Sequence, residues 1–437
     1  MNFTVNFVPL KELGEIVSGS TPDTSTKAYW EGDIPWITPA NLTEHTGIYF
    51  RSRLRKITKA GYNSCSTKLL PPGSILFSSR APIGHCAVTA FPLCTNQGFK
   101  SVIPNEKLDS VYGFFALKFF TPELVALGRG ATFSEINKEI FESFRIPLPS
   151  TSEQKRIASI LAKADRLRSL RRYALELSST YLQTVFLEMF GDPVTNPKNW
   201  QIRPLRSISL KFSDGPFGSN LKTEHYTSSG IRVIRLQNIG VGQLINDDKA
   251  YISEAHFATL DKHRCLPGDV IVGTLGDPNL RACILPSFFS VAVNKADCVQ
   301  IRVDPNEATT EYICWLLNLP HTLFLAKGMI HGQTRDRINM GRLAELKVPI
   351  PPLSPQEHFS LIVQRYDRLR IQQREALRQA DHLFQTLLYL AFHAELEPET
   401  APLPFTTEKE NADDTLIIPN LSDTTEGEIY QLSLPVE

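Results

Sequence analysis

The sequence predicts an α+β fold in which one architecture is built twice. We expect two similar mixed α/β units, each followed by a long helix, and the two helices pairing as an antiparallel coiled coil. Three observations indicate this. Short segments recur in order about 200 residues apart. Each copy begins with strand-like runs bounded by Pro and Gly. Each copy ends in a long stretch with apolar residues at alternating spacings of three and four.

The repeated segments keep a near-constant spacing. Val8–Leu10 is matched by Arg203–Leu205, 195 residues later, and Gly73 has the same spacing from Gly268. Further along, Ile146–Pro149 is matched by Val348–Pro351 at a spacing of 202. Three matches in one order indicate a copied unit with a few residues inserted late in the second copy.

The repeat sets the predicted boundaries. The two mixed α/β units are assigned to residues 1–150 and 201–353, and the two long helices to 151–190 and 354–393. A Gly- and Pro-containing linker occupies 191–200, because both residues end helices. The remaining residues, 394–437, are rich in acids, Pro and Thr and are expected to be disordered.

Both helices are predicted to begin at capping sequences. Ser354 precedes Pro355 and lies three residues before Glu357, and Thr151 has the same spacing to Gln154. Such spacing is typical of a capping box. The apolar stripe that follows contains, in the two copies, Ile157, Ile160, Ala164, Leu167, Arg171, Ala174, Ser178, Tyr181 and Val185, then Phe359, Ile362, Tyr366, Leu369, Gln373, Ala376, Ala380, Leu383 and Leu387.

Two arrangements fit this stripe. Each helix could pack on its own unit, or the helices could pair with each other. A helix of this length would extend about 60 Å, which is too long for one small domain to cover, so pairing is favoured. A pseudo-twofold relation between the copies would make the pair antiparallel, with Arg171 and Gln373 as polar positions that could help fix its register.

Composition restricts the function. The whole chain carries no net charge, yet residues 394–437 hold eleven acids and one base, which leaves 45 basic and 35 acidic side chains in residues 1–393. A basic body suits a polyanionic partner. No apolar stretch is long enough to span a membrane, no secretory signal is evident, and the seven cysteines form no CxxC pair. We therefore expect a cytoplasmic protein with reduced thiols that does not contact membranes.

Catalytic and ligand-binding motifs are missing from the sequence. It contains no phosphate-binding GxxxxGK[ST] loop, no HExxH zinc motif and no Asn/Asp-Pro-Pro-aromatic tetrapeptide of the kind an adenine methyltransferase carries. His85-Cys86 and His263-Arg264-Cys265 lack a second pair at zinc spacing. The sequence therefore favours a binding protein over an enzyme, with no catalytic, cofactor or metal site of its own.

Several segments together resemble the specificity subunit of type I restriction-modification enzymes. The linker from Met189 to Trp200 is similar to the central junction of that family, although Asn199 stands where Gly is usual. Ser78–Gly84 and Asn96–Phe99 are similar to its recognition-domain segments. Its passage from recognition domain to helix is similar to Gly130–Ile136, Ile146–Pro149 and Glu153–Ile157. The resemblance covers about residues 1–393, and the second copy has Gln356-Glu357 where the order Glu-Gln is usual.

The resemblance implies a function and a set of partners. Each unit would be a target-recognition domain that reads one half of a split site on double-stranded DNA. The helices would act as a spacer and as a docking surface for two methyltransferase subunits, and a motor and restriction subunit would join them. S-adenosylmethionine, ATP and Mg²⁺ would then belong to those partner subunits.

Candidate DNA contacts are the basic and amide side chains of both units. Lys and Arg bind phosphates, Arg can bridge guanine, and Asn or Gln can bridge adenine. In the first unit the candidates are Arg51, Arg53, Arg55, Lys56 and Lys59, with Lys68, Arg80, Thr132 and Ser134. In the second unit they are Lys222, His225, Arg232, Arg235, Gln237, Asn238, Gln333, Thr334 and Arg335. The same residues could instead form solvated faces and turns.

Two other functions stay open at this stage. One is a non-catalytic scaffold or DNA-binding adaptor whose helices bind protein. The other is a stand-alone DNA methyltransferase or nuclease with unrecognised motifs.

Overall fold

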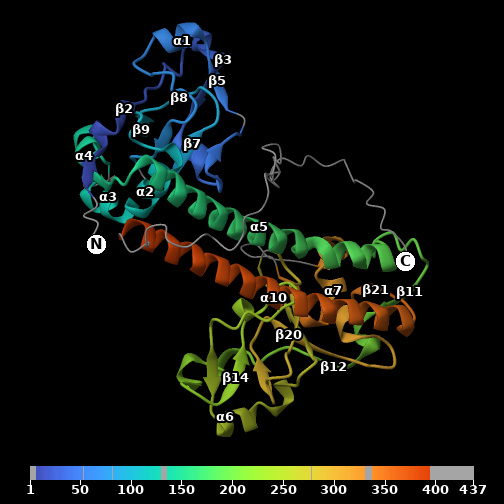
Figure 1. Ribbon diagram of the computed structural model, residues 1–437. Coiled ribbons are helices and arrows are strands. Elements are labelled where there is room, and N and C mark those ends of the chain that lie inside the picture. The colour runs from blue at the N-terminus through green and yellow to red at the C-terminus, as the bar shows by residue number, and fades with distance from the viewer. Residues whose placement is uncertain are drawn as a thin grey trace, which may run out of the picture.

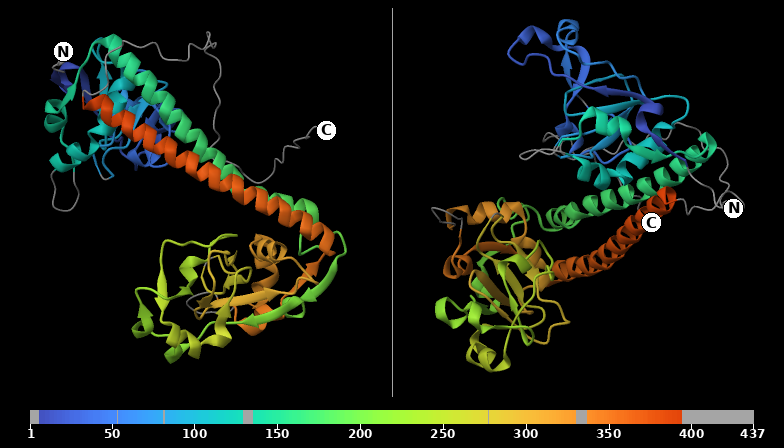
Figure 2. Two further views of the ribbon diagram at one scale, coloured as in Figure 1. Left: turned by 60° about the horizontal axis from the view of Figure 1, so that its bottom comes forward. Right: turned by 90° about the vertical axis from the view of Figure 1, so that its left-hand side faces the viewer.

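The computed structural model describes residues 6–52, 54–80, 82–128, 135–276, 278–329 and 337–393. It contains two globular units that lie on opposite sides of a pair of long helices, one unit toward each end (Figure 1). The two further views show the helices running side by side along their length (Figure 2). The predicted fold, two mixed α/β units with a helix after each, is confirmed.

The first unit is built around two sheets with strand orders β2-β9-β6-β7-β4 and β5-β3-β8, and a small β1-β10 pair closes it. Its strands are β1 (Phe7–Pro9), β2 (Gly14–Ser18), β3 (Trp30–Ile37), β4 (Tyr49–Phe50), β5 (Arg55–Ile57), β6 (Ile75–Phe77), β7 (Cys86–Thr89), β8 (Cys94–Thr95), β9 (Lys100–Pro104) and β10 (Arg145–Pro147). Its helices are α1 (Lys59–Asn63), α2 (Ser110–Phe119), α3 (Thr121–Leu127) and α4 (Lys138–Ser143).

The second unit repeats this plan, with sheets in the orders β12-β20-β17-β18 and β13-β15-β14-β19-β16 and a β11-β21 pair. Its strands are β11 (Gln201–Pro204), β12 (Ser209–Ser213), β13 (Tyr226–Thr227), β14 (Ile231–Ile234), β15 (Ala250–Ile252), β16 (Arg264–Cys265), β17 (Val270–Gly273), β18 (Ala282–Ile284), β19 (Ala292–Asn294), β20 (Cys298–Val303) and β21 (Lys347–Ile350). Its helices are α6 (Glu254–Thr259), α7 (Thr310–Leu317), α8 (Pro320–Ala326) and α9 (Met340–Ala344).

Individual hydrogen bonds confirm that the units are copies. The buried Tyr112 hydroxyl donates to the Pro147 carbonyl at 2.7 Å, and Tyr312 donates to Pro349 at 2.6 Å. Gln154 accepts a bond from the Asp109 N–H at 2.8 Å and donates to Pro149, while Gln356 makes the same pair of bonds with Thr309 and Pro351. Each Gln therefore fixes the start of a long helix to its own unit.

The long helices are α5 (Thr151–Phe190) and α10 (Leu353–Phe392), within one residue of the predicted boundaries. They pair in the antiparallel sense. Arg172 lies 3.6 Å from Asp381 across the pair, and Tyr366 donates to the Ser178 carbonyl at 2.6 Å. These contacts place the middle of the pair near Tyr173 and Glu375, which are again 202 residues apart in the sequence.

The C-terminal end of each helix is buried in the opposite unit. Leu182, Phe186 and Phe190 at the end of α5 belong to the core of the second unit. Phe384, Leu388 and Phe392 at the end of α10 belong to the core of the first unit. The ring centroids of Phe190 and Tyr312 are 4.8 Å apart, and those of Phe392 and Tyr112 are 5.4 Å apart. We call this arrangement the helix-end exchange.

The helix starts differ from the prediction. Ser150, not Thr151, caps α5 by accepting from the Glu153 N–H at 3.3 Å, and α10 begins after Pro352 without a side-chain cap. The predicted capping residue Ser354 therefore lies inside the helix. Gln154, which was expected to close a capping box, instead turns toward the first unit, and Gln356 turns in the same way toward the second, where both satisfy backbone groups.

The predicted stripe is also displaced at its C-terminal end. Leu182 and Phe384 are buried, whereas the predicted Tyr181 and Leu383 are half exposed. Leu167 and Leu369, predicted in the middle of the stripe, are exposed as well. The displacement is the same in both helices because an α-helix drifts by about 20° per heptad from a strict seven-residue repeat. Arg171 is exposed and Gln373 is partly buried. The charged contacts across the pair instead join Arg168 and Arg172 to Asp381.

The linker caps the end of α5. The Trp200 indole N–H donates to the Phe190 carbonyl at 2.9 Å, and the Lys198 ammonium donates to the Met189 carbonyl at 2.7 Å. Asn199 has φ of 54°, in the left-handed region where Gly is favoured and Asn is tolerated. That conformation explains how Asn can occupy the position where Gly is usual in the family.

Within the described residues, no single helix is long and apolar enough to cross a membrane. The bent pair α2 and α3 passes that test by composition, but Tyr112, Phe114 and Phe115 of α2 are buried in the core of the first unit. The tail, 394–437, lies outside the described residues.

Replacing Phe190 tests the helix-end exchange. Phe190→Ala removes a buried ring from the core of the second unit, so we expect a loss of about 3–5 kcal/mol in unfolding free energy. Hydrogen exchange should show reduced protection in the second unit, although Phe190 follows the first unit in sequence. Leu177→Ala, on an exposed part of the same helix, is the control and should change stability by less than about 0.5 kcal/mol. Loss of protection confined to the first unit would contradict the exchange.

Candidate DNA interface

Each unit contains one pair of parallel strands in the sheet that bears the candidate residues. In the first unit Trp36 and Ile37 of β3 pair with Cys94 and Thr95 of β8. In the second unit Val233 and Ile234 of β14 pair in the same way with β19. Parallel strands end at one edge of a sheet, so the residues that follow both strands lie together there. This edge carries several of the predicted contacts.

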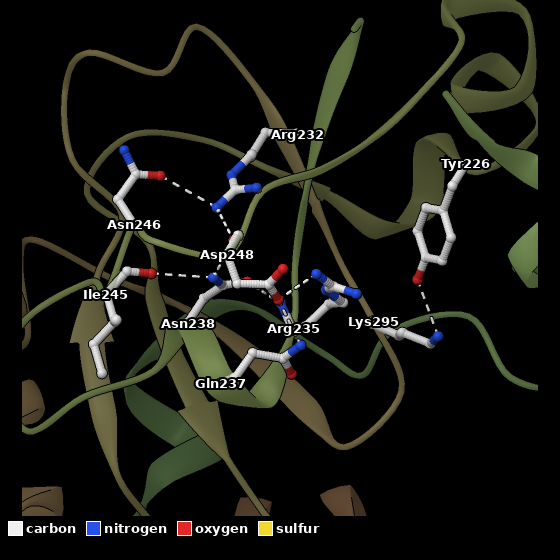
Figure 3. A network of polar contacts seen from close by, with 9 residues as sticks. All are labelled: Tyr226, Arg232, Arg235, Gln237, Asn238, Ile245, Asn246, Asp248 and Lys295. Atoms are coloured by element: carbon white, nitrogen blue, oxygen red, sulfur yellow. Dashed lines mark hydrogen bonds and ion pairs between the residues drawn. The ribbon is translucent and has the colours of Figure 1, made fainter. Parts of the chain in front are cut away.

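In the second unit Arg235 and Gln237 follow β14 directly, and both bind the carboxylate of Asp248. The Gln237 amide donates to Asp248 at 2.6 Å, and the Arg235 guanidinium forms an ion pair with the same carboxylate oxygen. Gln237 and Asp248 are exposed, and Arg235 is partly exposed. Figure 3 shows the three side chains converging. The predicted residues Arg235 and Gln237 are therefore brought together at the surface.

Arg232 and Asn238 do not belong to that surface. Arg232 is 3% exposed and Asn238 is fully buried, so neither side chain can contact DNA in this conformation, and for these two the prediction is wrong. Arg232 donates to the Asp248 carbonyl at 2.7 Å, and Asn238 donates to the same carbonyl at 2.8 Å. Burial lowers the pKa of Arg232. Both residues point inward from the strand and turn, where they anchor a loop.

Three residues of the second unit were missed by the sequence prediction. Besides Asp248, Lys295 follows β19 and donates to the Tyr226 hydroxyl at 3.0 Å, and the Arg235 guanidinium lies 5.8 Å from the Tyr226 ring. We call Arg235, Gln237, Asp248, Tyr226 and Lys295 the strand-end cluster. No sequence signal joins them, because the parallel pairing of β14 with β19 connects residues about 60 apart along the chain.

The first unit places its cations on β5 instead. Arg55 lies opposite Trp36 at the end of β3, and its guanidinium stacks 3.6 Å from the centre of the Trp30 ring. Lys56 on the same strand, Lys59 at the start of α1, and Arg51 are exposed. Stacking on Trp30 limits the motion of Arg55 while its N–H groups stay available for a ligand.

The remaining described candidates have acidic neighbours, and all are exposed except His225, which is partly buried. Lys68 pairs with Glu15, and Arg80 lies 3.0 Å from Glu135. In the second unit Lys222 lies 3.5 Å from Glu224, and the His225 ring packs against His256 with centroids 4.0 Å apart. Exposed ion pairs contribute about 0–1 kcal/mol, so a phosphate can compete for these cations.

The last predicted contacts, Arg53, Thr132, Ser134, Gln333, Thr334 and Arg335, lie outside the described residues.

The described part of the chain holds no group of three or more His, Cys, Asp and Glu side chains placed to bind a metal. The seven cysteines are free thiols, and burial raises the pKa of Cys265 and Cys283 to about 12, which disfavours the reactive thiolate.

Comparison with known proteins defines the class. A family model described as the type I restriction modification DNA specificity domain matches residues 2–176 and 197–379, one match for each copy of the repeat. The chain belongs to this family, the DNA specificity subunits of type I restriction-modification enzymes.

One relative is similar over most of the chain, and another over about a third of it. The type I restriction enzyme MjaIX specificity subunit of Methanocaldococcus jannaschii is 33% identical over 377 residues, which is 81% of this chain and 85% of that protein. The EcoR124I/EcoR124II specificity subunit of Escherichia coli is 31% identical over 170 residues, which is 37% of this chain and 41% of that protein.

Solved structures share the fold. The S subunit of a type I system from M. genitalium aligns with a TM-score of 0.53 at 16% identity, over 92% of this chain and 98% of that one. A chain of a solved type I system aligns with a TM-score of 0.57 at 18% identity, over 90% of this chain and 98% of that one.

Removing Arg55 tests the edge of the first unit as a DNA contact. Each cation at a phosphate adds about 0.9 to the slope of log affinity against log salt concentration. Arg55→Ala should therefore make the slope shallower by about that amount, measured by titrating labelled duplex at several salt concentrations. Lys107→Ala is the matched control, because Lys107 is exposed beside the start of α5, where its carbonyl accepts from Gln154. Equal slopes for both variants would contradict this assignment.

Proposed function

We propose that the chain is a non-catalytic subunit, acting in the cytoplasm, that reads a two-part target on double-stranded DNA. Each unit reads one half-site through the side chains at its strand edge, and the helix pair sets the distance between the halves. The observation that carries this proposal is the helix-end exchange, because each unit contains part of both helices in its core. Neither unit can shift along the pair without breaking apolar contacts.

Partner docking is supported by the exposed middle of the helix pair. Leu167 and Leu369, at equivalent positions of the two helices, are 40% and 57% exposed. Tyr181 and Leu383, also equivalent, are 50% and 45% exposed. Because Arg168 stacks on Phe384 across the pair, the exposed Leu167 and Leu383 lie at about the same level of the two helices, and the pseudo-twofold relation gives Leu369 and Tyr181 an equivalent level. Two equivalent pairs of exposed apolar side chains suit two identical partners.

These partners, we propose, are two methyltransferase subunits, which a restriction and motor subunit then joins. S-adenosylmethionine, ATP and Mg²⁺ are assigned to those subunits. The relatives named as restriction-enzyme specificity subunits and the missing catalytic motifs in the sequence both support this division of labour.

Lengthening the helix pair tests whether it sets the distance between the half-sites. Four residues inserted after Tyr173 and four after Glu375 extend both helices at the middle of the pair by about 6 Å, with little change of helical phase. We expect unchanged half-sites separated by a longer gap, read by mapping methylated adenines in cells that hold the methyltransferase subunit. The same insertion in one helix alone is the control and should disrupt the pair. An unchanged gap in the double insertion would overturn the spacer function.

The division of labour makes a separate prediction. The purified chain, incubated with labelled S-adenosylmethionine and duplex containing the mapped target, should transfer no methyl groups. Addition of the methyltransferase subunit should start transfer at that target. Turnover by the chain alone would identify it as an enzyme, and sequence-independent DNA binding of the assembled complex would favour a scaffold.

A further inference from the structure

An acid inside the DNA-facing surface requires an explanation, since a carboxylate repels phosphates. We propose that Asp248 is a specificity-determining residue of the second unit, which fixes the orientation of Gln237 and Arg235 so that they read purine bases. This inference rests on the proposed function and adds the class of base that the strand-end cluster takes.

The backbone at Asp248 is held from the interior. Arg232 and Asn238, both buried, donate to its carbonyl, and Asn238 also donates to the Ile245 carbonyl at 3.0 Å (Figure 3). On the far side of the loop, the Arg374 guanidinium of α10 donates to the Gln243 side chain at 2.7 Å. The backbone that carries the Asp248 carboxylate is therefore held by β14 and the turn after it, and its loop also contacts α10, without any contribution from DNA.

The carboxylate determines which way the Gln237 amide faces. A carboxylate only accepts hydrogen bonds, so the amide nitrogen turns toward it, as the 2.6 Å contact shows. The second N–H and the oxygen of Gln237 remain, which is the donor and acceptor pair that bridges N7 and N6 of adenine. A freely rotating amide would offer both orientations and discriminate less.

Arg235 is oriented by the same carboxylate. One terminal nitrogen donates to Asp248, and the guanidinium lies over the Tyr226 ring. Its remaining N–H groups match the two acceptors of guanine, O6 and N7. Both side chains are thus prepared for a purine, and ordering them beforehand reduces the conformational entropy lost on binding.

The equivalent turn of the first unit supports the assignment. There the Asn41 side chain accepts from the Thr38 N–H at 2.9 Å, as Asn238 does from Arg235 at 2.9 Å. The turn is therefore the same in both units. At the two outward positions, however, the first unit has Thr38 and Ala40 where the second has Arg235 and Gln237. The scaffold is retained while the side chains that face outward differ, as expected where two units read different sequences.

The test compares Asp248→Ala with Asp247→Ala. Asp247 is an exposed neighbour for which the described residues provide no ion pair or side-chain hydrogen bond, so both variants lose one negative charge from the same loop. Each variant, assembled with the methyltransferase subunit, is titrated with duplexes that carry the mapped target and every single-base change in both half-sites. The readout is the ratio of affinities for the target and for each changed duplex.

We expect Asp248→Ala to lower this ratio by about tenfold at one or two purine positions of one half-site. The other half-site and the Asp247→Ala variant should keep the wild-type ratios. In a Gln237→Ala background, Asp248→Ala should cause a smaller further loss, because the acid acts through that amide. The melting temperature, measured in parallel, should stay unchanged.

Two results would overturn the inference. If Asp248→Ala raised affinity for every duplex by one common factor, the acid would act only by charge repulsion. If every affinity fell equally, it would act only by supporting the loop. Failure of the proposed function would give a different result, because the wild-type complex would then bind the mapped target no better than the duplexes with single-base changes.

Discussion

The helix-end exchange is the contact on which the rest of the structure depends. A pair of exposed helices can slide or splay, since apolar residues at a two-stranded seam leave much of their surface in water. Here the last two turns of each helix are instead built into the core of the opposite unit, with Phe190 against Tyr312 and Phe392 against Tyr112. Separating the units along the helix axis would expose both sets of rings. The distance between the units is therefore fixed by core packing.

The same exchange couples spacing to recognition. Gln154 and Gln356 tie the helix starts to their own units, and Arg374 of α10 reaches the loop that carries Asp248. A residue that orients base-reading side chains is thus linked through its loop to the helix that sets the gap. The exposed apolar positions lie between these anchoring points.

Much of this architecture can be predicted from the sequence, because the duplication repeats the residues that define the fold of each unit. The spacing of 202 between Pro147 and Pro349 also relates Gln154 to Gln356 and the ends of α5 and α10. The predicted stripe was wrong at Leu167, Tyr181, Leu369 and Leu383, which are exposed, because a heptad pattern does not include the helical drift or the neighbouring core. The residues of the candidate DNA interface were harder to predict from the sequence than the fold. Arg232 and Asn238 looked like DNA contacts by residue type, but strand alternation and the turn direct them inward. Lys295 reaches the cluster through the parallel pairing of β14 with β19, and Asp248 through the long loop between β14 and β15, and no local pattern encodes either position.

The central claim is that two recognition units are held at one fixed separation. It is tested most directly by mapping methylated adenines across a genome in cells with and without this chain, in the presence of the methyltransferase subunit. The account predicts that methylation dependent on the chain falls on one target with two short specific halves and a non-specific gap of a single length. A contiguous target, or halves separated by gaps of several lengths, would contradict it.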